Sequence, residues 1–346
     1  MHDIERRIKG MPSVFCLSGS PFQALCMIEA IQEFEITDYR VLLCLSENEL
    51  PRLSQIETLL DKYNITYEIE SVNFHITKAE RLKALLSNKN KYKVAFIGDC
   101  NNELLIFKSF RYVSDGGTLV YLDDGIATIQ FFNGMFQLSS KLKPYYKLMS
   151  KIRRIDFDRY FFTVYENLTD DRHIPIICDF RYFSVLQKSK TNVSGVYFIG
   201  TQIKDYCGFE GIHVDQFMIV LQSLLHELKT IYPSEQLIYV PHGREILTKD
   251  LIALCCEEGI EYRPSDITVE MMLLEENDYP RAVYGFTSSA LYNIKKIFPK
   301  TEICNITFIG NSPKTNGKEI TSQYYAKFGI TRKIVDLKMN DEQSNC

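Results

Sequence analysis

Short apolar runs alternate with longer segments of helical periodicity along the first half of the chain. Five apolar runs of strand length occur there, at residues 13–18, 39–45, 65–72, 93–97 and 118–122. Helical spacing of apolar residues fills three of the intervals between them, at 22–34, 52–63 and 78–89. Strands that alternate with helices in this way predict βαβ units and a parallel sheet.

The same alternation resumes after the polar stretch 187–194, which is the best candidate for a linker. Strand-like runs occur at 196–199, 236–240, 281–286 and 303–309, and helical patterns at 214–230 and 247–258, with a further helix ending near 297. We therefore predict an α/β fold of two Rossmann-like domains, at residues 11–188 and 189–325, followed by a C-terminal tail at 326–346. A chain of 346 residues is long enough for both cores.

Composition narrows the classes of function without naming one. Hydrophobic residues make up 45% and charged residues 24%, as in ordinary globular proteins. The net charge of −4 gives no general attraction to nucleic acid, so none is expected as a partner. The ten cysteines contain no CxxC pair, and neither they nor the six histidines have zinc-ligand spacing. With no apolar run long enough to span a membrane, we expect a cytoplasmic protein.

An acid pair, Asp123-Asp124, directly follows the apolar run 118–122 and precedes Gly125. An Asp-Gly pair is common in plain turns, so a structural role is one interpretation. A second is a general base, because the charge of one carboxylate raises the pKa of its neighbour. A third is a shared Mg²⁺ ion held against the phosphates of a nucleotide. These residues alone leave all three open.

Two polar segments of the second half follow predicted strands and suit an anionic ligand. Pro241 and His242 follow the run 236–240, where a protonated imidazole can hydrogen-bond a phosphate. Thr287, Ser288 and Ser289 follow the run 281–286 and precede a helix. These hydroxyl residues favour a helix N-cap, and the N-terminus of a helix is also an anion site.

Three further positions are candidates on weaker grounds. Glu270 begins an apolar helical run, where an acid suits a helix start or the two hydroxyls of a ribose. Gly19-Ser20-Pro21 and Gly200-Thr201-Gln202 open the first βα turn of each half, either as tight connections or as loops lining a ligand cleft.

The segment Lys141–Arg154 (KLKPYYKLMSKIRR) is the strongest local cluster of positive charge. A solvated helix is its simplest interpretation. Contact with an anionic glycan or with phospholipid headgroups is the alternative, which would make the protein peripheral on the inner face of a bacterial membrane.

Taken in order, these motifs resemble the bacterial sialyltransferases, most closely glycosyltransferase family 52, the lipooligosaccharide and capsule sialyltransferases. The residues that carry the resemblance are Ser20-Pro21-Phe22-Gln23, Asp123-Asp124-Gly125, Pro241-His242, Glu270 and Ser288-Ser289. The resemblance spans residues 12 to 300 or so and implies a GT-B fold, with the donor CMP-sialic acid held mainly by the C-terminal domain. It further implies an inverting, metal-independent enzyme without a cofactor, which can form a homodimer.

The resemblance also implies roles for single residues. Asp124 is expected to deprotonate the acceptor hydroxyl, and His242 to contact the phosphate of the departing CMP. The remaining donor contacts would come from Gly200, Thr201, Gln202, Pro241, Glu270, Thr287, Ser288 and Ser289. Ser20, Gln23, Asp123 and Gly125 would support the base. The order Pro241-His242-Gly243 departs from the usual His-Pro order of that group, which leaves the direction of the imidazole open.

Three functions are compatible with these residues. The first is transfer of sialic acid to a galactose hydroxyl of a bacterial surface glycan. The second is the use of another nucleotide sugar, such as a different CMP-nonulosonate or a UDP-hexose. The third is a non-catalytic protein that binds nucleotide sugars during capsule assembly.

Overall fold

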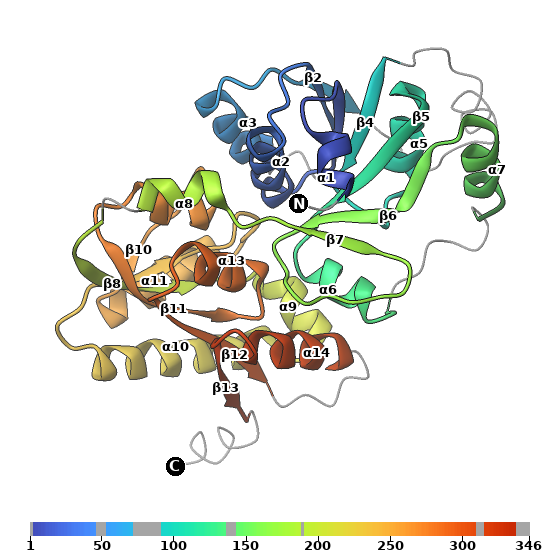
Figure 1. Cartoon of the computed structure of the whole chain (residues 1–346). Coiled ribbons are helices and arrows are strands. Elements are labelled where there is room, and N and C mark those ends of the chain that lie inside the picture. Colours follow the sequence, from blue (N-terminus) through green and yellow to red (C-terminus); the bar gives the residue numbers. More distant parts are fainter. Residues whose placement is uncertain are drawn as a thin grey trace. The chain divides into compact units, whose positions relative to one another are not determined.

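The chain divides into two compact units, Met1–Phe183 and Ser184–Cys346, each with its own parallel sheet (Figure 1). The computed structural model describes residues 3–45, 53–71, 91–135, 143–187, 190–308 and 315–336. The predicted helix at 78–89 lies outside the described residues.

The first unit contains a seven-stranded sheet in the order β3-β2-β1-β4-β5-β6-β7, with every neighbouring pair parallel. Its strands are β1 (Ser13–Leu17), β2 (Tyr39–Leu45), β3 (Glu68–Ser71), β4 (Tyr92–Ile97), β5 (Val113–Leu122), β6 (Asp156–Thr163) and β7 (Ile174–Ile177).

Helices cover both faces of this sheet, with α2 and α3 on one face and α5 on the other (Figure 1). The helices of this unit are α1 (Asp3–Ile8), α2 (Pro21–Glu33), α3 (Leu53–Lys62), α5 (Glu103–Tyr112), α6 (Ile126–Phe132), α7 (Lys143–Arg153) and α8 (Arg181–Gln187), which crosses the boundary between the units. Under α2, Phe15 of β1 stacks on Phe96 of β4 with 4.6 Å between ring centroids, and Phe34 packs on Phe96. Buried apolar strands covered on both faces are typical of parallel sheets.

The second unit contains a six-stranded parallel sheet in the order β10-β9-β8-β11-β12-β13. Its strands are β8 (Val193–Ile199), β9 (Leu237–Val240), β10 (Glu261–Tyr262), β11 (Tyr279–Phe286), β12 (Glu302–Phe308) and β13 (Thr331–Val335). Its helices are α9 (Ile203–Glu210), α10 (Val214–Ile231), α11 (Thr248–Glu258), α12 (Val269–Glu275), α13 (Ser289–Ile297) and α14 (Thr315–Ala326). Phe217 of α10 packs on Phe286 of β11, which in turn packs on Phe198 of β8 in the core.

The elements depart from the predicted pattern in several places. Strands β6 and β7 and the helices α6 and α8 were not predicted, whereas α7 lies in the basic segment for which a helix was the simplest interpretation. The sequence DFDRYFFT of β6 mixes charged and aromatic residues without a clear period. The predicted second domain ended at residue 325 with a tail beyond it, whereas β13 continues the sheet by pairing with β12 from Cys304↔Thr331 to Phe308↔Val335. Its sequence TRKIV is too polar to stand out as a strand, and the pairing edge of β12 supplies the missing stabilisation.

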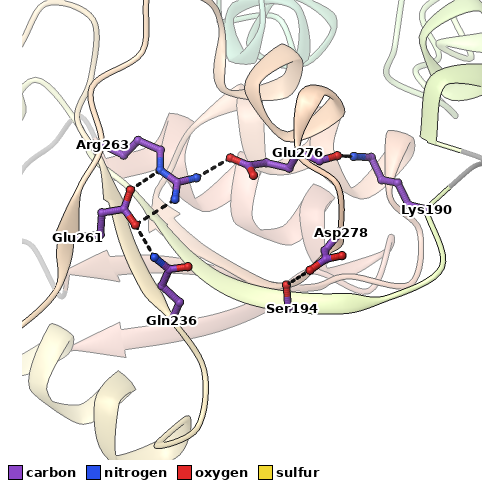
Figure 2. Close-up of polar contacts among 7 residues, drawn as sticks. All are labelled: Lys190, Ser194, Gln236, Glu261, Arg263, Glu276 and Asp278. Carbon is purple, nitrogen blue, oxygen red and sulfur yellow. Dashed lines mark hydrogen bonds and ion pairs between the residues drawn. The ribbon is translucent and has the colours of Figure 1, made fainter.

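The amino ends of the second sheet are fixed by a network of polar side chains (Figure 2). The guanidinium of Arg263 donates to both oxygens of Glu261, at 2.6 and 3.0 Å, and to Glu276 at 2.5 Å. Ser194 donates to Asp278 at 2.5 Å, and Lys190 bonds the carbonyl of Glu276. These polar groups satisfy one another at the edge from which the strands start.

Strand order places one switch point in each sheet. The order reverses between β1 and β4 in the first unit, and between β8 and β11 in the second. Ligands of open α/β sheets bind outside the carboxyl ends of the strands at such points, because the loops there diverge to opposite faces. The candidate residues named above follow β1, β5, β8, β9 and β11 or begin the helix α12.

Candidate active site

Asp123 is a buried anchor at the end of β5. Its side chain is 0% exposed, and each oxygen accepts two hydrogen bonds. Oδ1 accepts from the Gly125 N–H at 3.0 Å and the Thr128 hydroxyl at 2.7 Å. Oδ2 accepts from the Thr163 hydroxyl at 2.6 Å and the Val164 N–H at 2.9 Å. Burial raises the pKa of Asp123 to about 6, against the opposing effect of these four bonds. This carboxylate therefore joins the ends of β5 and β6.

Asp124 is half-buried and is held by the side chain of Gln23 on α2. The Gln23 amide donates to Asp124 Oδ1 at 2.7 Å. Gln23 is itself buried, and its Oε1 accepts from the backbone N–H and the hydroxyl of Ser18, at 3.0 and 3.1 Å. The amide is thus fixed in orientation at both ends. The structure brings Gln23 and Asp124 together although 101 residues separate them in sequence.

Two glycines make this arrangement possible. A Cβ on Gly98, at the end of β4, would lie 2.3 Å from Gln23 Oε1, so only glycine lets the Gln23 side chain pass. Gly125 has φ of 67° and ψ of −136°, a region that favours glycine, and from there its N–H reaches Asp123. Ser20 stands at the N-cap of α2 without a capping side-chain bond, and its own N–H donates to the Ser18 carbonyl at 2.8 Å.

Gly98 and Asp99 belong to this edge and were missed by the sequence reasoning. Asp99 Oδ1 accepts from the Asn101 N–H at 2.8 Å in the loop between β4 and α5. Burial raises the pKa of Cys100, and the nearby carboxylates of Asp99 and Asp124 raise it further. The signal was available, since residues 98 and 99 directly follow the predicted strand 93–97 beside the switch point.

In the second unit, Gly200 and Gln202 shape the loop after β8. The Gly200 N–H donates to the Val240 carbonyl at 2.8 Å, and a Cβ at Gly200 would lie 2.6 Å from the Tyr239 hydroxyl. Gln202 is the N-cap of α9, where its Oε1 accepts from the Asp205 N–H at 2.5 Å. Thr201 between them is half-buried. Close packing on β9 therefore accounts for the glycine, and helix capping accounts for Gln202.

His242 is half-buried in the turn after β9, next to half-buried Pro241. Its Nδ1 accepts from the Arg244 N–H at 3.2 Å, and its carbonyl accepts from the Glu245 N–H at 2.8 Å. A neutral imidazole that accepts at Nδ1 carries its proton on Nε2. Nδ1 therefore faces the Arg244 N–H, while contact of the imidazole with a phosphate stays a prediction.

Glu270 lies in the first turn of α12 and is only 4% exposed. Its Oε1 accepts from the Asn293 amide of α13 at 2.7 Å. Burial raises the pKa of Glu270, and the bond from Asn293 opposes that rise. The sequence reasoning did not identify Asn293. Contact of Glu270 with the ribose hydroxyls stays a prediction.

The loop after β11 leads into the N-terminus of α13. Ser288 is its N-cap and accepts from the Ala290 N–H at 3.3 Å, while the Tyr325 hydroxyl donates to the Ser288 carbonyl at 2.8 Å. The Thr287 hydroxyl is buried without a hydrogen-bond partner among the described residues. Ser289 opens the helix, and the first turn of α13 contains no acid. The capping interpretation is correct for Ser288, and the anion interpretation is compatible with it.

Most of the basic segment forms α7, and Arg153 anchors this helix to the start of β5. This arginine is 5% exposed and donates to Asp115 at 2.8 Å and to the Phe110 carbonyl at 2.6 Å. Lys147 and Lys151 are exposed, as are Leu148 (42%) and Ile152 (65%). The outer face thus combines two lysines with two aliphatic side chains, and Arg153 is not part of it.

Two further findings concern metal ions and membranes. The described part of the chain contains no group of three or more His, Cys, Asp or Glu side chains arranged to hold a metal ion. Among the helices that the structure describes, none has the length and apolar character needed to cross a bilayer.

Comparison with known proteins identifies the class of fold. Neither a protein-family model nor a curated protein sequence matches the chain. Among solved structures, it is similar to the 2,6-sialyltransferase of Photobacterium sp. JT-ISH-224 in complex with CMP and lactose. That similarity has 14% identity and a TM-score of 0.54 over 94% of this chain and 78% of the other.

Two other solved structures are similar over most of their length. The α-2,3-sialyltransferase of Photobacterium phosphoreum is 13% identical, with a TM-score of 0.48 over 92% of this chain and 97% of the other. The GT-B domain of a Photobacterium damselae sialyltransferase is also 13% identical, with a TM-score of 0.47 over 94% and 99% of the two chains. The chain has the GT-B fold, and the predicted fold class is confirmed.

Proposed function

We propose that this protein is an inverting glycosyltransferase that moves sialic acid from CMP-sialic acid to a galactose hydroxyl of a bacterial surface glycan. The observation that carries the proposal is the pair Gln23–Asp124, in which a buried amide orients one carboxylate at the carboxyl edge of a GT-B domain. A held but half-buried carboxylate suits a general base, which must meet the substrate in a fixed direction.

The proposed chemistry begins with the acceptor hydroxyl. Asp124 takes its proton while the hydroxyl oxygen attacks the anomeric carbon of sialic acid. The bond from that carbon to the phosphate oxygen of CMP breaks, and its electron pair leaves with CMP. One in-line displacement inverts the anomeric centre.

The donor side of the proposal lies in the second unit. Negative charge that develops on the departing phosphate is stabilised by the amides at the start of α13, by Ser288 and Ser289, and by the Nε2 proton of His242. Pro241, Gly200, Thr201, Gln202 and Thr287 line the same strand ends. Glu270 accepts the ribose hydroxyls, with Asn293 fixing one of its oxygens in the way that Gln23 fixes Asp124.

We further propose that this chemistry needs no divalent cation. The four hydrogen bonds to Asp123 occupy both of its oxygens, so the acid pair offers one carboxylate to a ligand instead of two. Hydroxyls, helix-end amides and an imidazole take the place of a cation at the phosphate. Activity is therefore expected to persist in EDTA, and a strict requirement for Mg²⁺ would contradict the assignment of Asp124 as base.

Asp124→Asn tests the proposal directly. We expect the rate of CMP release from CMP-sialic acid to fall about 10²–10⁴-fold, as on loss of a general base, with CMP affinity unchanged. Asp38→Asn is the matched control, because Asp38 is an exposed aspartate of the same unit paired with Lys91. Equal turnover of Asp124→Asn and wild type would refute the base assignment. A screen of donors separates the alternatives, since release from UDP-hexoses or another CMP-nonulosonate would identify a different donor, and no turnover of any donor would indicate a binding protein.

The outer face of α7 supports a second partner, an anionic lipid surface. Lys147 and Lys151 alternate with Leu148 and Ile152, so the aliphatic groups and the ammonium groups are exposed on the same part of the helix. Helices of this kind insert apolar side chains at the headgroup level while lysines contact anionic lipids. Such contact would bring the enzyme to lipid-linked acceptors.

A further inference from the structure

Glu245 lies in the loop between β9 and α11, three residues after His242, and its carboxylate accepts from three backbone amides. Oε2 accepts from the Ile203 N–H at 2.9 Å. Oε1 accepts from the N–H groups of Ile246 and Leu247, at 2.8 and 2.7 Å. Ile203 is the first residue of α9, whereas Leu247 is the N-cap of α11. One side chain therefore joins the loop after β8 to the loop after β9.

The negative charge of Glu245 lies at the N-termini of two helices, α9 and α11. A carboxylate is stabilised where helix N-termini direct their amides at it, and Glu245 faces the starts of both α9 and α11. Each of these helices also has an acid in its first turn, Asp205 and Asp250, whereas the first turn of α13 has none. Of these three helix starts, that of α13 therefore has no acid in its first turn to oppose an anionic ligand.

The same loop determines where His242 points. The Glu245 N–H donates to the His242 carbonyl at 2.8 Å, and the Arg244 N–H donates to Nδ1 of the imidazole at 3.2 Å. The Gly200 N–H bonds the Val240 carbonyl and keeps the two loops adjacent. Of the three bonds described for Glu245, only the one from the Ile203 N–H reaches the loop after β8. Loss of that bond would remove this side-chain link between the loop after β8 and the turn that contains His242.

We propose that Glu245 is the positioning residue of the donor site, which acts through His242 by clamping the loops after β8 and β9 together. This inference rests on the proposed function, because it assumes that His242 contacts the phosphate of the nucleotide. Glu245 does not touch the ligand, since its oxygens are engaged with Ile203, Ile246 and Leu247.

Glu245→Gln is the sharpest variant, because the amide nitrogen has the size of the oxygen it replaces and cannot accept a hydrogen bond. Either the Ile203 N–H of the loop after β8 or the N–H groups of Ile246 and Leu247 after β9 then lose their acceptor, while the other side keeps it. A hydrogen bond to a charged group is worth about 1.5–3 kcal/mol, so we expect the Kd for CMP to rise about 10- to 100-fold. Glu235→Gln is the matched control, since Glu235 accepts from the Gly195 N–H at 3.1 Å at the start of the same sheet.

A double-mutant cycle with His242→Ala separates positioning from general stability. CMP affinity is measured by calorimetry for wild type, the two single variants and the double variant, below the unfolding temperature of each. If Glu245 acts through His242, Glu245→Gln costs little affinity in the His242→Ala background. An equal loss of affinity in both backgrounds would overturn the inference. So would CMP binding by Glu245→Gln as tight as that of wild type.

The experiment also distinguishes this inference from the proposed function. Failure of wild type to bind CMP would overturn the proposed function together with the inference. Tight binding of CMP by wild type, with no effect of Glu245→Gln, would overturn the inference alone.

Discussion

Replacing Gln23 by leucine removes the group that orients Asp124 while keeping the volume of the side chain. The variant loses the amide bond to Asp124 Oδ1 and leaves the Ser18 N–H without its acceptor in a buried site. The bond to a carboxylate is worth about 1.5–3 kcal/mol. If that energy is what holds Asp124 toward the acceptor, kcat falls about 10- to 100-fold.

Loss of this bond also changes the pH dependence, in a direction that a purely structural defect would not produce. A hydrogen bond donated to a carboxylate favours its ionised form, so Asp124 stays protonated to higher pH in Gln23→Leu than in wild type. The acid limb of the rate profile therefore moves to higher pH. The limb moves in this direction because Asp124 must be deprotonated to act as a base.

The assay is CMP release at saturating donor and acceptor, across the pH range, together with the Kd for CMP. The second unit is expected to bind CMP by itself, so an unchanged Kd shows that the variant is folded there. Gln222→Leu is the matched control. The Gln222 amide donates to the carboxylate of Glu258, with 3.1 Å between the two atoms, and neither residue is a candidate for the site. A kcat of Gln23→Leu within twofold of wild type would show that Gln23 does not position Asp124, as would an acid limb at the same pH as in wild type.

Three further predictions follow from single sites. Asp123→Asn cannot ionise, whereas the pKa of Asp123 is about 6 in wild type against the ordinary 3.8, so its ionisation costs the folded wild type about 2 kcal/mol as pH rises from 4 to 7. The destabilisation caused by the variant should shrink by that amount in urea unfolding at the two pH values, and equal destabilisation at both would contradict it. Ser288→Ala with Ser289→Ala should weaken CMP binding about tenfold and cost about 1 kcal/mol of stability through the lost cap, and CMP affinity equal to wild type would exclude these hydroxyls as phosphate ligands. The double variant Lys147→Glu, Lys151→Glu should bind vesicles that contain phosphatidylglycerol more than 30-fold more weakly, since each basic residue contributes about 1 kcal/mol. Its binding to neutral vesicles should not change, and unchanged binding to the anionic vesicles would contradict the proposed lipid contact.

The sequence predicted the parallel sheets because their central strands are continuous apolar runs, such as YRVLLCL at Tyr39–Leu45. The peripheral strands β6 and β13 were missed because polar residues interrupt them, and β7 (IPII) because it is only four residues long and contains a proline. Pairing with a neighbouring strand compensates for weak local preference. Helix starts and the strand-end position of the candidate residues followed from the same alternation of strands and helices.

The roles of neighbouring acids lay beyond the reach of sequence. Asp123 and Asp124 are adjacent and chemically identical. They differ in their partners, because only Asp123 accepts hydrogen bonds from Thr163, the last residue of β6, and from Val164 after it, which lie 40 and 41 residues away in sequence. Similarly, nothing in the sequence distinguishes Glu245 from the other acids, because its bond from the Ile203 N–H comes from a distant part of the chain. Local patterns report which residues follow a strand, whereas burial and long-range partners decide which of them is an anchor.

Each unit holds one half-buried or buried acid at its carboxyl edge by the primary amide of a neighbouring helix. Gln23 of α2 holds Asp124, and Asn293 of α13 holds Glu270. A lysine or arginine in either place would bind the carboxylate more strongly, but its full charge would favour the ionised form and reduce the basicity of the acid. A neutral amide supplies direction at a smaller cost in basicity. For Asp124 this matters because a base must be both oriented and able to take a proton, and for Glu270 because a carboxylate paired with a cation would be a poorer acceptor for ribose hydroxyls. The type of donor at each acid thus favours orientation over neutralisation, which is what the proposed transfer reaction requires.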